Sequence, residues 1–345
     1  MPRHGLTIRV RPGRPEPARV KSFCLPSIAL LLLSGVTPAE GAGADPRIES
    51  EEPEMEVVLV TGSQPGPGLW KVSSGDHVLW ILGEVSPFTR KVKWQPKEFD
   101  QVLRNSQELL LDFSGYWEAD KSDMAAYRRA EKLPKGSALK DVISPALHAR
   151  MDATAKIFRA QSLEELHPFA ATNRLVKSAM QSLDMSGFSA RFAAEQMGQK
   201  WSIKTTYYWA QEQTVEDRLR TWQHPSNAVC MERLLDAIED GGDGVKRLAN
   251  AWAVGDVESL RQLVPAYSFS RDGFRTGACA AAMRGGEQQA RDYNLRRTQG
   301  WVKEAERVLK DNRRTVAVVL MSEIFAPEGY LAALRARGYE IVEPH

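Results

Sequence analysis

The chain has 345 residues, of which 43% are hydrophobic and 26% are charged, and its formal net charge is +2. This is the composition of a globular protein with enough apolar residues for a large core. Six Lys or Arg and two Glu lie in residues 1–44, so the rest of the chain carries 40 basic against 42 acidic residues. No basic face typical of nucleic-acid binding is present, and we predict no nucleic-acid partner.

The N-terminus has the pattern of a secretory signal peptide. An apolar run at residues 22–36 follows Arg19 and Lys21, and the small residues at 41–44 suit a signal peptidase. The apolar run is too short to span a bilayer as a helix. We predict that residues 1–44 are removed on export, that the mature chain has no transmembrane helix, and that it is periplasmic in a Gram-negative bacterium or secreted.

Residues 45–65 begin with an acidic stretch that lacks an apolar pattern, which is typical of a disordered leader. Pro and Gly alternate at residues 65–68 and break any regular element there. We therefore predict an acidic leader over 45–65 and a folded domain over 66–345.

A β-hairpin is predicted at the start of this domain. Two apolar runs, residues 69–72 and 77–83, flank the turn residues 73–76, in which Gly75 can take a positive φ. The second strand ends in Gly83, where the absence of a Cβ lets another part of the chain approach closely.

Further apolar runs predict the rest of the sheet. Residues 108–113 and 314–321 are apolar on both faces, as in the middle of a parallel sheet covered by helices. A helix and a last strand at 339–342 follow the second run. From about 115 to 285 the pattern is mostly helical, with one β-like run at 200–207. We predict an α/β (α+β) fold with a central mixed sheet formed by the N- and C-terminal halves and a large helical insertion at about 115–285.

Two cysteines, Cys230 and Cys279, remain after the predicted signal peptide is removed. In an oxidising compartment such a pair can form a disulfide, whereas the alternative is two buried thiols on separate helices. The spacing fits no metal-binding motif, and both alternatives stay open.

Several segments, in this order and spacing, resemble the TraB/GumN family. They are Gly-Leu-Trp-Lys-Val at 68–72, Trp-Ile-Leu-Gly at 80–83, and residues 251–260, 294–301 and 328–339. The family is related to the Tiki-type membrane proteases and to the erythromycin-esterase/ChaN-like fold. The resemblance covers residues 66–345 and implies the same α/β fold.

The resemblance also implies a pair of Gly-x-x-His motifs that hold a divalent metal. The first motif falls on residues 83–86 and has Ser86 in place of its histidine. The second falls on residues 320–323 and ends in Glu323 instead of histidine. The acid that the family has after its Leu-rich strand is present as Asp112.

Without imidazole ligands, the candidate metal ligands are Glu84, Asp112 and Glu323. An all-oxygen set of this kind suits manganese, magnesium or calcium rather than zinc. Three converging carboxylates would repel one another unless a cation or Arg296 neutralised them. With Ser86, these residues are the candidates for a catalytic site that is vestigial, and we expect no bound cofactor unless a divalent cation is held there.

Three functional hypotheses follow. We prefer a catalytically degenerate protein with a binding or structural role in the cell envelope, because both motif histidines are absent. The alternative is a metal-dependent, peptidase-like hydrolase with a site rebuilt from carboxylates. A serine nucleophile at Ser86 or Ser322 is disfavoured because neither lies in a Gly-x-Ser-x-Gly elbow. The histidines weighed as its base are His77, His148, His167 and His224.

A binding role would take a peptide, a glycan or an envelope protein as partner. Aromatic side chains near the predicted site are candidates to line a groove, although aromatics at such a strand-to-helix joint more often belong to a core. These residues are Trp94, Tyr116, Trp117, Tyr207, Tyr208 and Trp209.

Overall fold

The computed structural model describes residues 57–89, 91–113, 120–185, 189–210, 227–267, 275 and 277–344. The predicted signal peptide and residues 45–56 of the predicted leader lie outside this part of the chain. So do Tyr116, Trp117 and His224.

Strands β2 (Trp70–Ser74) and β3 (His77–Glu84) form the predicted hairpin. Gly75 in its turn has a φ of 60°, a left-handed conformation that glycine adopts without strain. Trp70 pairs with Ile81 and Val72 with Leu79 across the antiparallel ladder. The hairpin therefore places β3 in the sheet, and β3 ends at Glu84, inside the first motif at residues 83–86.

The six-stranded sheet has the order β6-β5-β7-β3-β2-β8. β3 pairs in parallel with β7 (Arg314–Leu320), β7 with β5 (Glu108–Phe113), and β5 with β6 (Lys204–Trp209). The last strand, β8 (Glu340–Val342), pairs antiparallel with β2. Both chain ends thus contribute to one mixed sheet, which confirms the predicted fold class.

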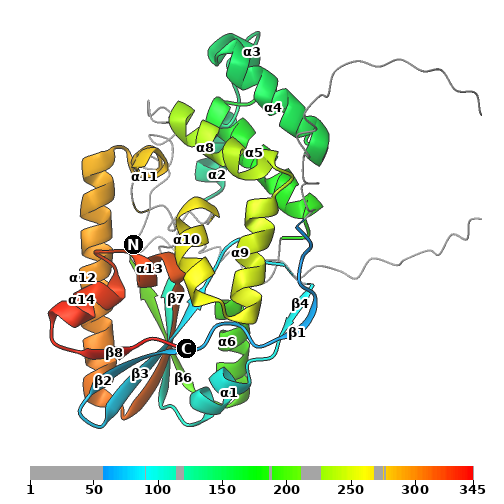
Figure 1. Ribbon diagram of the computed structural model, residues 1–345. Helices are drawn as coiled ribbons and strands as arrows, with labels where there is room; N and C mark the ends of the chain where they lie inside the picture. Colours follow the sequence, from blue (N-terminus) through cyan, green and yellow to red (C-terminus); the bar gives the residue numbers. More distant parts are fainter. Residues whose placement is uncertain are drawn as a thin grey trace, which may run out of the picture. The chain divides into compact units, whose positions relative to one another are not determined.

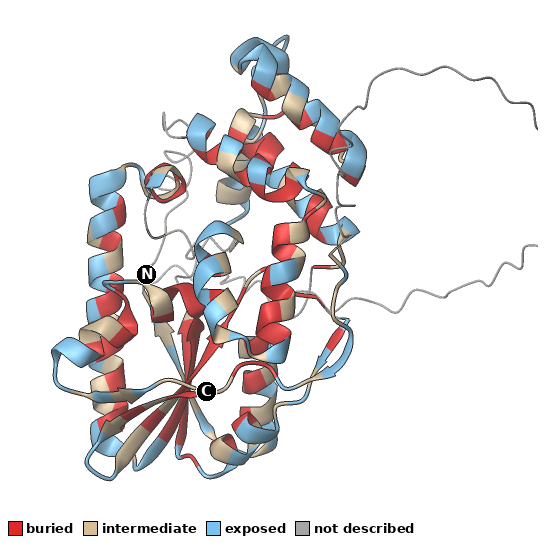
Figure 2. Ribbon diagram, viewed as in Figure 1, coloured by how far each residue is buried: buried red, intermediate tan, exposed pale blue. Residues whose placement is uncertain are grey.

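Strands β5 and β7 are buried over almost their whole length, and β3 is buried from Ile81 to Glu84 (Figure 2). In β5, residues Glu108 to Asp112 are all buried, and in β7 only Arg314 is exposed. Strands that are apolar on both faces need a cover on both faces.

Helices provide that cover (Figure 1). Helix α12 (Glu287–Asp311) lies along one face of the sheet, while α1 (Lys97–Arg104) and α6 (Ala190–Lys200) lie along the other. Gly198 lets α6 approach β5 closely, since a Cβ at this position would lie 3.0 Å from Leu109.

The chain between β5 and β7 is mainly helical, as predicted, and β6 returns from it to the sheet. The other helices in the described parts of this stretch are α2 (Lys121–Ala130), α3 (Leu139–Val142), α4 (Pro145–Phe158), α5 (Pro168–Ser182), α8 (Asn227–Glu239), α9 (Asp243–Val254), α10 (Val257–Tyr267) and α11 (Gly277–Arg284). After β7 come the short helices α13 (Met321–Phe325) and α14 (Tyr330–Ala336). Within the described ranges, no helix has the length and apolar character needed to cross a membrane.

A disulfide joins α8 to α11. The Sγ atoms of Cys230 and Cys279 are 2.08 Å apart, and both residues are fully buried. Of the two alternatives that the sequence left open, the structure therefore has the disulfide.

The folded part begins before residue 66, earlier than predicted. Strand β1 (Gly62–Gln64) pairs in parallel with β4 (Val92–Trp94). The backbone N–H of Val60 donates to Asn250 Oδ1 at 2.8 Å. Residues 57–65, which we assigned to a disordered leader, are therefore tied to the domain by backbone hydrogen bonds that composition alone does not reveal.

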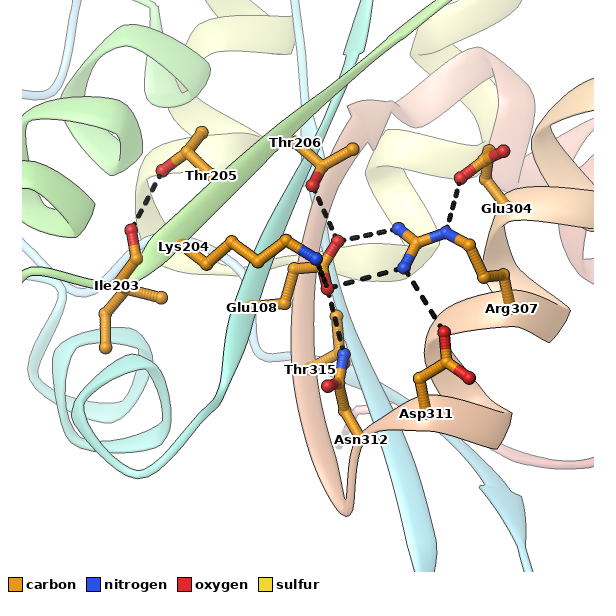
Figure 3. A network of polar contacts seen from close by, with 10 residues as sticks. All are labelled: Glu108, Ile203, Lys204, Thr205, Thr206, Glu304, Arg307, Asp311, Asn312 and Thr315. Carbon is orange, nitrogen blue, oxygen red and sulfur yellow. Dashed lines mark hydrogen bonds and ion pairs between the residues drawn. The ribbon is translucent and has the colours of Figure 1, made fainter.

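Glu108, at the start of β5, lies in a network of donors (Figure 3). Its carboxylate accepts hydrogen bonds from Thr206 and Arg307, both at 2.6 Å, and from Lys204 at 2.9 Å and Asn312 at 3.1 Å. Burial alone would raise the pKa of Glu108, but these hydrogen bonds outweigh it and lower the pKa from 4.5 to about 2.

We expect Glu108→Gln to lower the free energy of unfolding at neutral pH by about 2 kcal/mol. The pKa shift corresponds to about 3 kcal/mol, which we reduce because Lys204 and Arg307 are partly exposed. A lowered folded-state pKa stabilises the fold above pH 4.5, and the effect is lost as the pH falls towards 2. Urea unfolding of both proteins at several pH values measures this, and an equally large difference at pH 2 would contradict it.

Candidate functional site

Glu84 ends β3 and is held at the N-terminus of α6. Its carboxylate accepts hydrogen bonds from the hydroxyl of Ser189 and the backbone N–H of Arg191, both at 3.0 Å, and from Arg191 Nε at 2.8 Å. Ser189 is also the N-cap of α6. The carboxylate thus has a salt bridge, a hydroxyl donor and the positive end of a helix as partners.

The ion pair of Arg191 and Glu84 is largely shielded from solvent, with side-chain exposures of 16% and 5%. Burial disfavours the charged form of Arg191, but the charges of Glu84 and Asp112 outweigh it and raise the pKa of Arg191. Arg191 therefore stays protonated.

Asp112, near the end of β5, is bound from α12 and α14. Its Oδ2 accepts hydrogen bonds from Arg297 Nη2 at 2.7 Å and from the hydroxyl of Tyr330 at 3.0 Å. Arg297 Nε in turn donates to the Tyr330 hydroxyl at 2.9 Å. Burial raises the pKa of Tyr330 well above its usual value; the charge of Arg297 opposes this effect, and the charges of Asp112 and Glu323 add to it. The Tyr330 hydroxyl therefore keeps the proton that it donates.

Glu323 lies in α13 and is completely buried. It forms a salt bridge with Arg275, and its Oε1 lies 3.4 Å from Arg297 Nη1. Two hydrogen bonds fix the position of Arg275. Its backbone carbonyl accepts one from Asn294 Nδ2 at 2.5 Å, and its Nη2 donates one to the backbone carbonyl of Glu328 at 3.1 Å.

The α12 arginine that pairs with Asp112 and Glu323 is Arg297, not Arg296 as expected. Arg296 is exposed on α12, whereas Arg297 has only 1% of its surface exposed. Successive residues of a helix point about 100° apart, so a shift of one position exchanges the outer face for the inner one. Two further arginines, Arg191 and Arg275, were missed by the sequence analysis.

The first motif ends with Ser86, which lies partly buried in the segment after β3. Gly83 has a clear packing role, because a Cβ there would lie 2.5 Å from Met321 Sδ and 2.9 Å from Ile324 Cδ1. The missing side chain allows α13, which carries the second motif, to rest directly on β3.

The structure brings Glu84, Asp112 and Glu323 to one edge of the sheet. β3 and β7 are paired in register, with Glu84 opposite Leu320, and Asp112 follows the residue of β5 that pairs with Val318 of β7. All three carboxylates are buried and each has a guanidinium partner. Three carboxylates and three arginines give the cluster no net charge.

A divalent cation does not fit this donor set. It would have to compete for the carboxylates with three guanidinium groups of like charge. Within the described ranges, no group of three or more His, Cys, Asp or Glu is placed to hold a metal ion. Guanidinium is a planar donor that binds carboxylates well, and it occupies at least one oxygen of each of the three carboxylates.

The profile of the TraB/PrgY/gumN family matches residues 68–343, which is most of the chain. The chain belongs to this family. The match confirms the resemblance that the hairpin and the C-terminal segments indicated. Searches of curated proteins and of solved structures found no significant match.

Two of the aromatic residues that we considered in this TraB/PrgY/gumN protein form an exposed patch on the α6 side of the sheet. Tyr207 is 40% exposed and donates to Glu195, and Trp209 is 44% exposed and stacks on Phe113 at 4.7 Å. Tyr208 points to the other face, where its hydroxyl donates to the carbonyl of Arg297 at 3.0 Å.

Trp94 lies apart from these residues, in β4. It packs against Phe99 and Trp252 and borders a hollow of about 280 Å³ near Pro65 and Gln95. The described members of the predicted aromatic groove thus lie in separate places in the fold.

The contacts of the described histidines do not favour any of them as the base of a serine nucleophile. His77 begins β3, at the end opposite to Ser86, and its Nδ1 lies 2.6 Å from the carbonyl of Leu309. His148 is bound to Glu164 at 2.6 Å, and His167 is the N-cap of α5.

Proposed function

We propose that this TraB/PrgY/gumN protein is exported, that it is catalytically degenerate, and that it has a binding or structural role in the cell envelope. The main support for the proposal is that each of the carboxylates Glu84, Asp112 and Glu323 is paired with an arginine. Asp112, for example, has Arg297 Nη2 at 2.7 Å, where a metal-dependent hydrolase would need an accessible ligand.

The residues in the two histidine positions support the same conclusion. Neither Ser86 nor Glu323 can supply the imidazole nitrogen that zinc-type sites use. Glu323 is fully buried and shared between Arg275 and Arg297. A general base must be within reach of the proton that it removes, and a buried carboxylate bound by two guanidiniums is poorly suited to that task.

Export to the periplasm or beyond the cell is supported by the apolar run at residues 22–36 and by the disulfide. Disulfides persist in oxidising compartments and are rare in the bacterial cytosol. Exposed aromatic side chains such as Tyr207 and Trp209 are suitable contacts for a peptide, a glycan or an envelope protein.

One preparation tests both export and the loss of catalysis. The full chain is expressed in a Gram-negative host, and the periplasmic fraction is analysed by mass spectrometry. We expect a form that lacks the N-terminal segment and contains the disulfide. Recovery of the intact chain from the cytosol would contradict export.

The purified periplasmic form is then assayed with peptide and ester libraries, with and without added Mn²⁺. We expect no turnover above that of a Glu323→Gln variant used as a matched control. Turnover that needs Mn²⁺ and disappears in Glu323→Gln would establish the alternative, a metal-dependent hydrolase with a carboxylate site.

A further inference from the structure

Arg297 lies between two carboxylates that come from different parts of the chain. Its Nη2 is 2.7 Å from Asp112 Oδ2 near the end of β5, and its Nη1 is 3.4 Å from Glu323 Oε1 in α13. The three side chains are at most 1% exposed. One guanidinium therefore serves both anions in a place that water barely reaches.

Without a positive charge this arrangement would be very unfavourable. Two ionised carboxylates at this depth repel each other and lose their hydration. The fold fixes both of them near the same end of the sheet, since β5 and β7 are adjacent parallel strands. Arg297 is the cation that lies between Asp112 and Glu323 Oε1, while Arg275 pairs with the other oxygen of Glu323.

We propose that Arg297 is a built-in replacement for a bound divalent cation, and that the pair of Asp112 and Glu323 is a latent cation site which this side chain closes. The inference rests on the proposed function, in which the carboxylates no longer serve a metal. It also identifies Arg297 as the residue that excludes the ion, and it predicts that removal of the Arg297 side chain allows a divalent cation to bind.

Calcium binds carboxylate oxygens at about 2.3 to 2.6 Å. Arg297 Nη2 lies nearly as close to Asp112 Oδ2, at 2.7 Å. A further oxygen is available, because Asp112 Oδ1 is buried and has no hydrogen-bond partner among the described residues. A cavity left by the arginine side chain would have room for an ion and its water ligands.

The test is thermal unfolding of the full mature chain and its variants with Ca²⁺ or Mn²⁺. We expect no shift of Tm for the wild type. We expect Arg297→Ala and Arg297→Gln to have a lower Tm, which added Ca²⁺ or Mn²⁺ raises by on the order of 3 °C or more. Guanidinium ion at concentrations too low to denature should have the same effect, since it restores the missing group.

Two controls separate this site from others. Arg296→Ala removes an exposed arginine one residue away and should give no response to either ion. Arg297→Ala combined with Glu323→Gln removes one of the two carboxylates and should lose the response to divalent ions.

If Arg297→Ala does not fold by itself, it is refolded from urea with and without Ca²⁺ or Mn²⁺. Recovery only with a cation supports the proposal. The proposal is wrong if neither the Tm nor the refolding yield of the Arg297 variants changes with Ca²⁺ or Mn²⁺. It is also wrong if the wild type binds Mn²⁺ stoichiometrically and Glu323→Gln abolishes that binding. Hydrolysis by the wild type would instead refute the proposed function, so the two failures are distinguishable.

Discussion

Arg191→Met should lower the free energy of unfolding by about 3 kcal/mol, the low end of the range for removing one partner of a buried ion pair. Glu84 would remain buried with its negative charge uncompensated. The effect stays at the low end because the Ser189 hydroxyl and the backbone N–H at position 191 still donate to it. Urea unfolding at neutral pH, followed by circular dichroism, measures the change.

The control combines Arg191→Met with Glu84→Gln, so that neither charge is present. We expect the double variant to recover a large part of the lost stability, because the desolvated charge is gone. A double variant that is as unstable as the sum of the two single variants would show that packing of Arg191, for example over the Phe113 ring, matters more than charge.

Removal of the disulfide is the second change with a large expected effect. Cys230 and Cys279 are 49 positions apart, and a cross-link over a loop of this length stabilises by up to about 4 kcal/mol through the entropy of the unfolded chain. We expect the Cys230→Ser, Cys279→Ser variant to unfold at a lower urea concentration, with a loss of 2 to 4 kcal/mol.

Reduction of the wild type should reproduce this loss, and the double Ser variant should not respond to the reductant. The comparison isolates the cross-link from the burial of two serine hydroxyls, which also destabilises. Identical unfolding curves for the oxidised and reduced wild type would mean that the bond contributes nothing.

Much of the fold could be predicted from the sequence because its strongest signals are local. The apolar runs at residues 108–113 and 314–321 indicated central strands, and both are buried in the sheet. Gly75 indicated the hairpin turn. The start of the domain could not be placed, because β1 depends on a partner strand about 30 residues away.

The acidic half of the candidate site could also be predicted, whereas the basic half could not. Glu84, Asp112 and Glu323 were found through motif positions at strand ends. Arg191 and Arg275 come from the helical insertion, and no local pattern relates them to those strands. Arg296 and Arg297 are adjacent, and only the phase of the helix against the sheet decides which one faces inward.

The pairing of β3 with β7 sets the order in which the protein can fold. Val78 is hydrogen-bonded across the ladder to a strand that begins at Arg314, so the middle of the sheet cannot close until nearly the whole chain is available. Contacts between residues so distant in sequence slow folding, and during synthesis the backbone edges of β3 and β5 that later pair with β7 stay open. A chaperone that shields exposed strand edges would therefore increase the yield of this protein, most of all when its C-terminal strands are delayed.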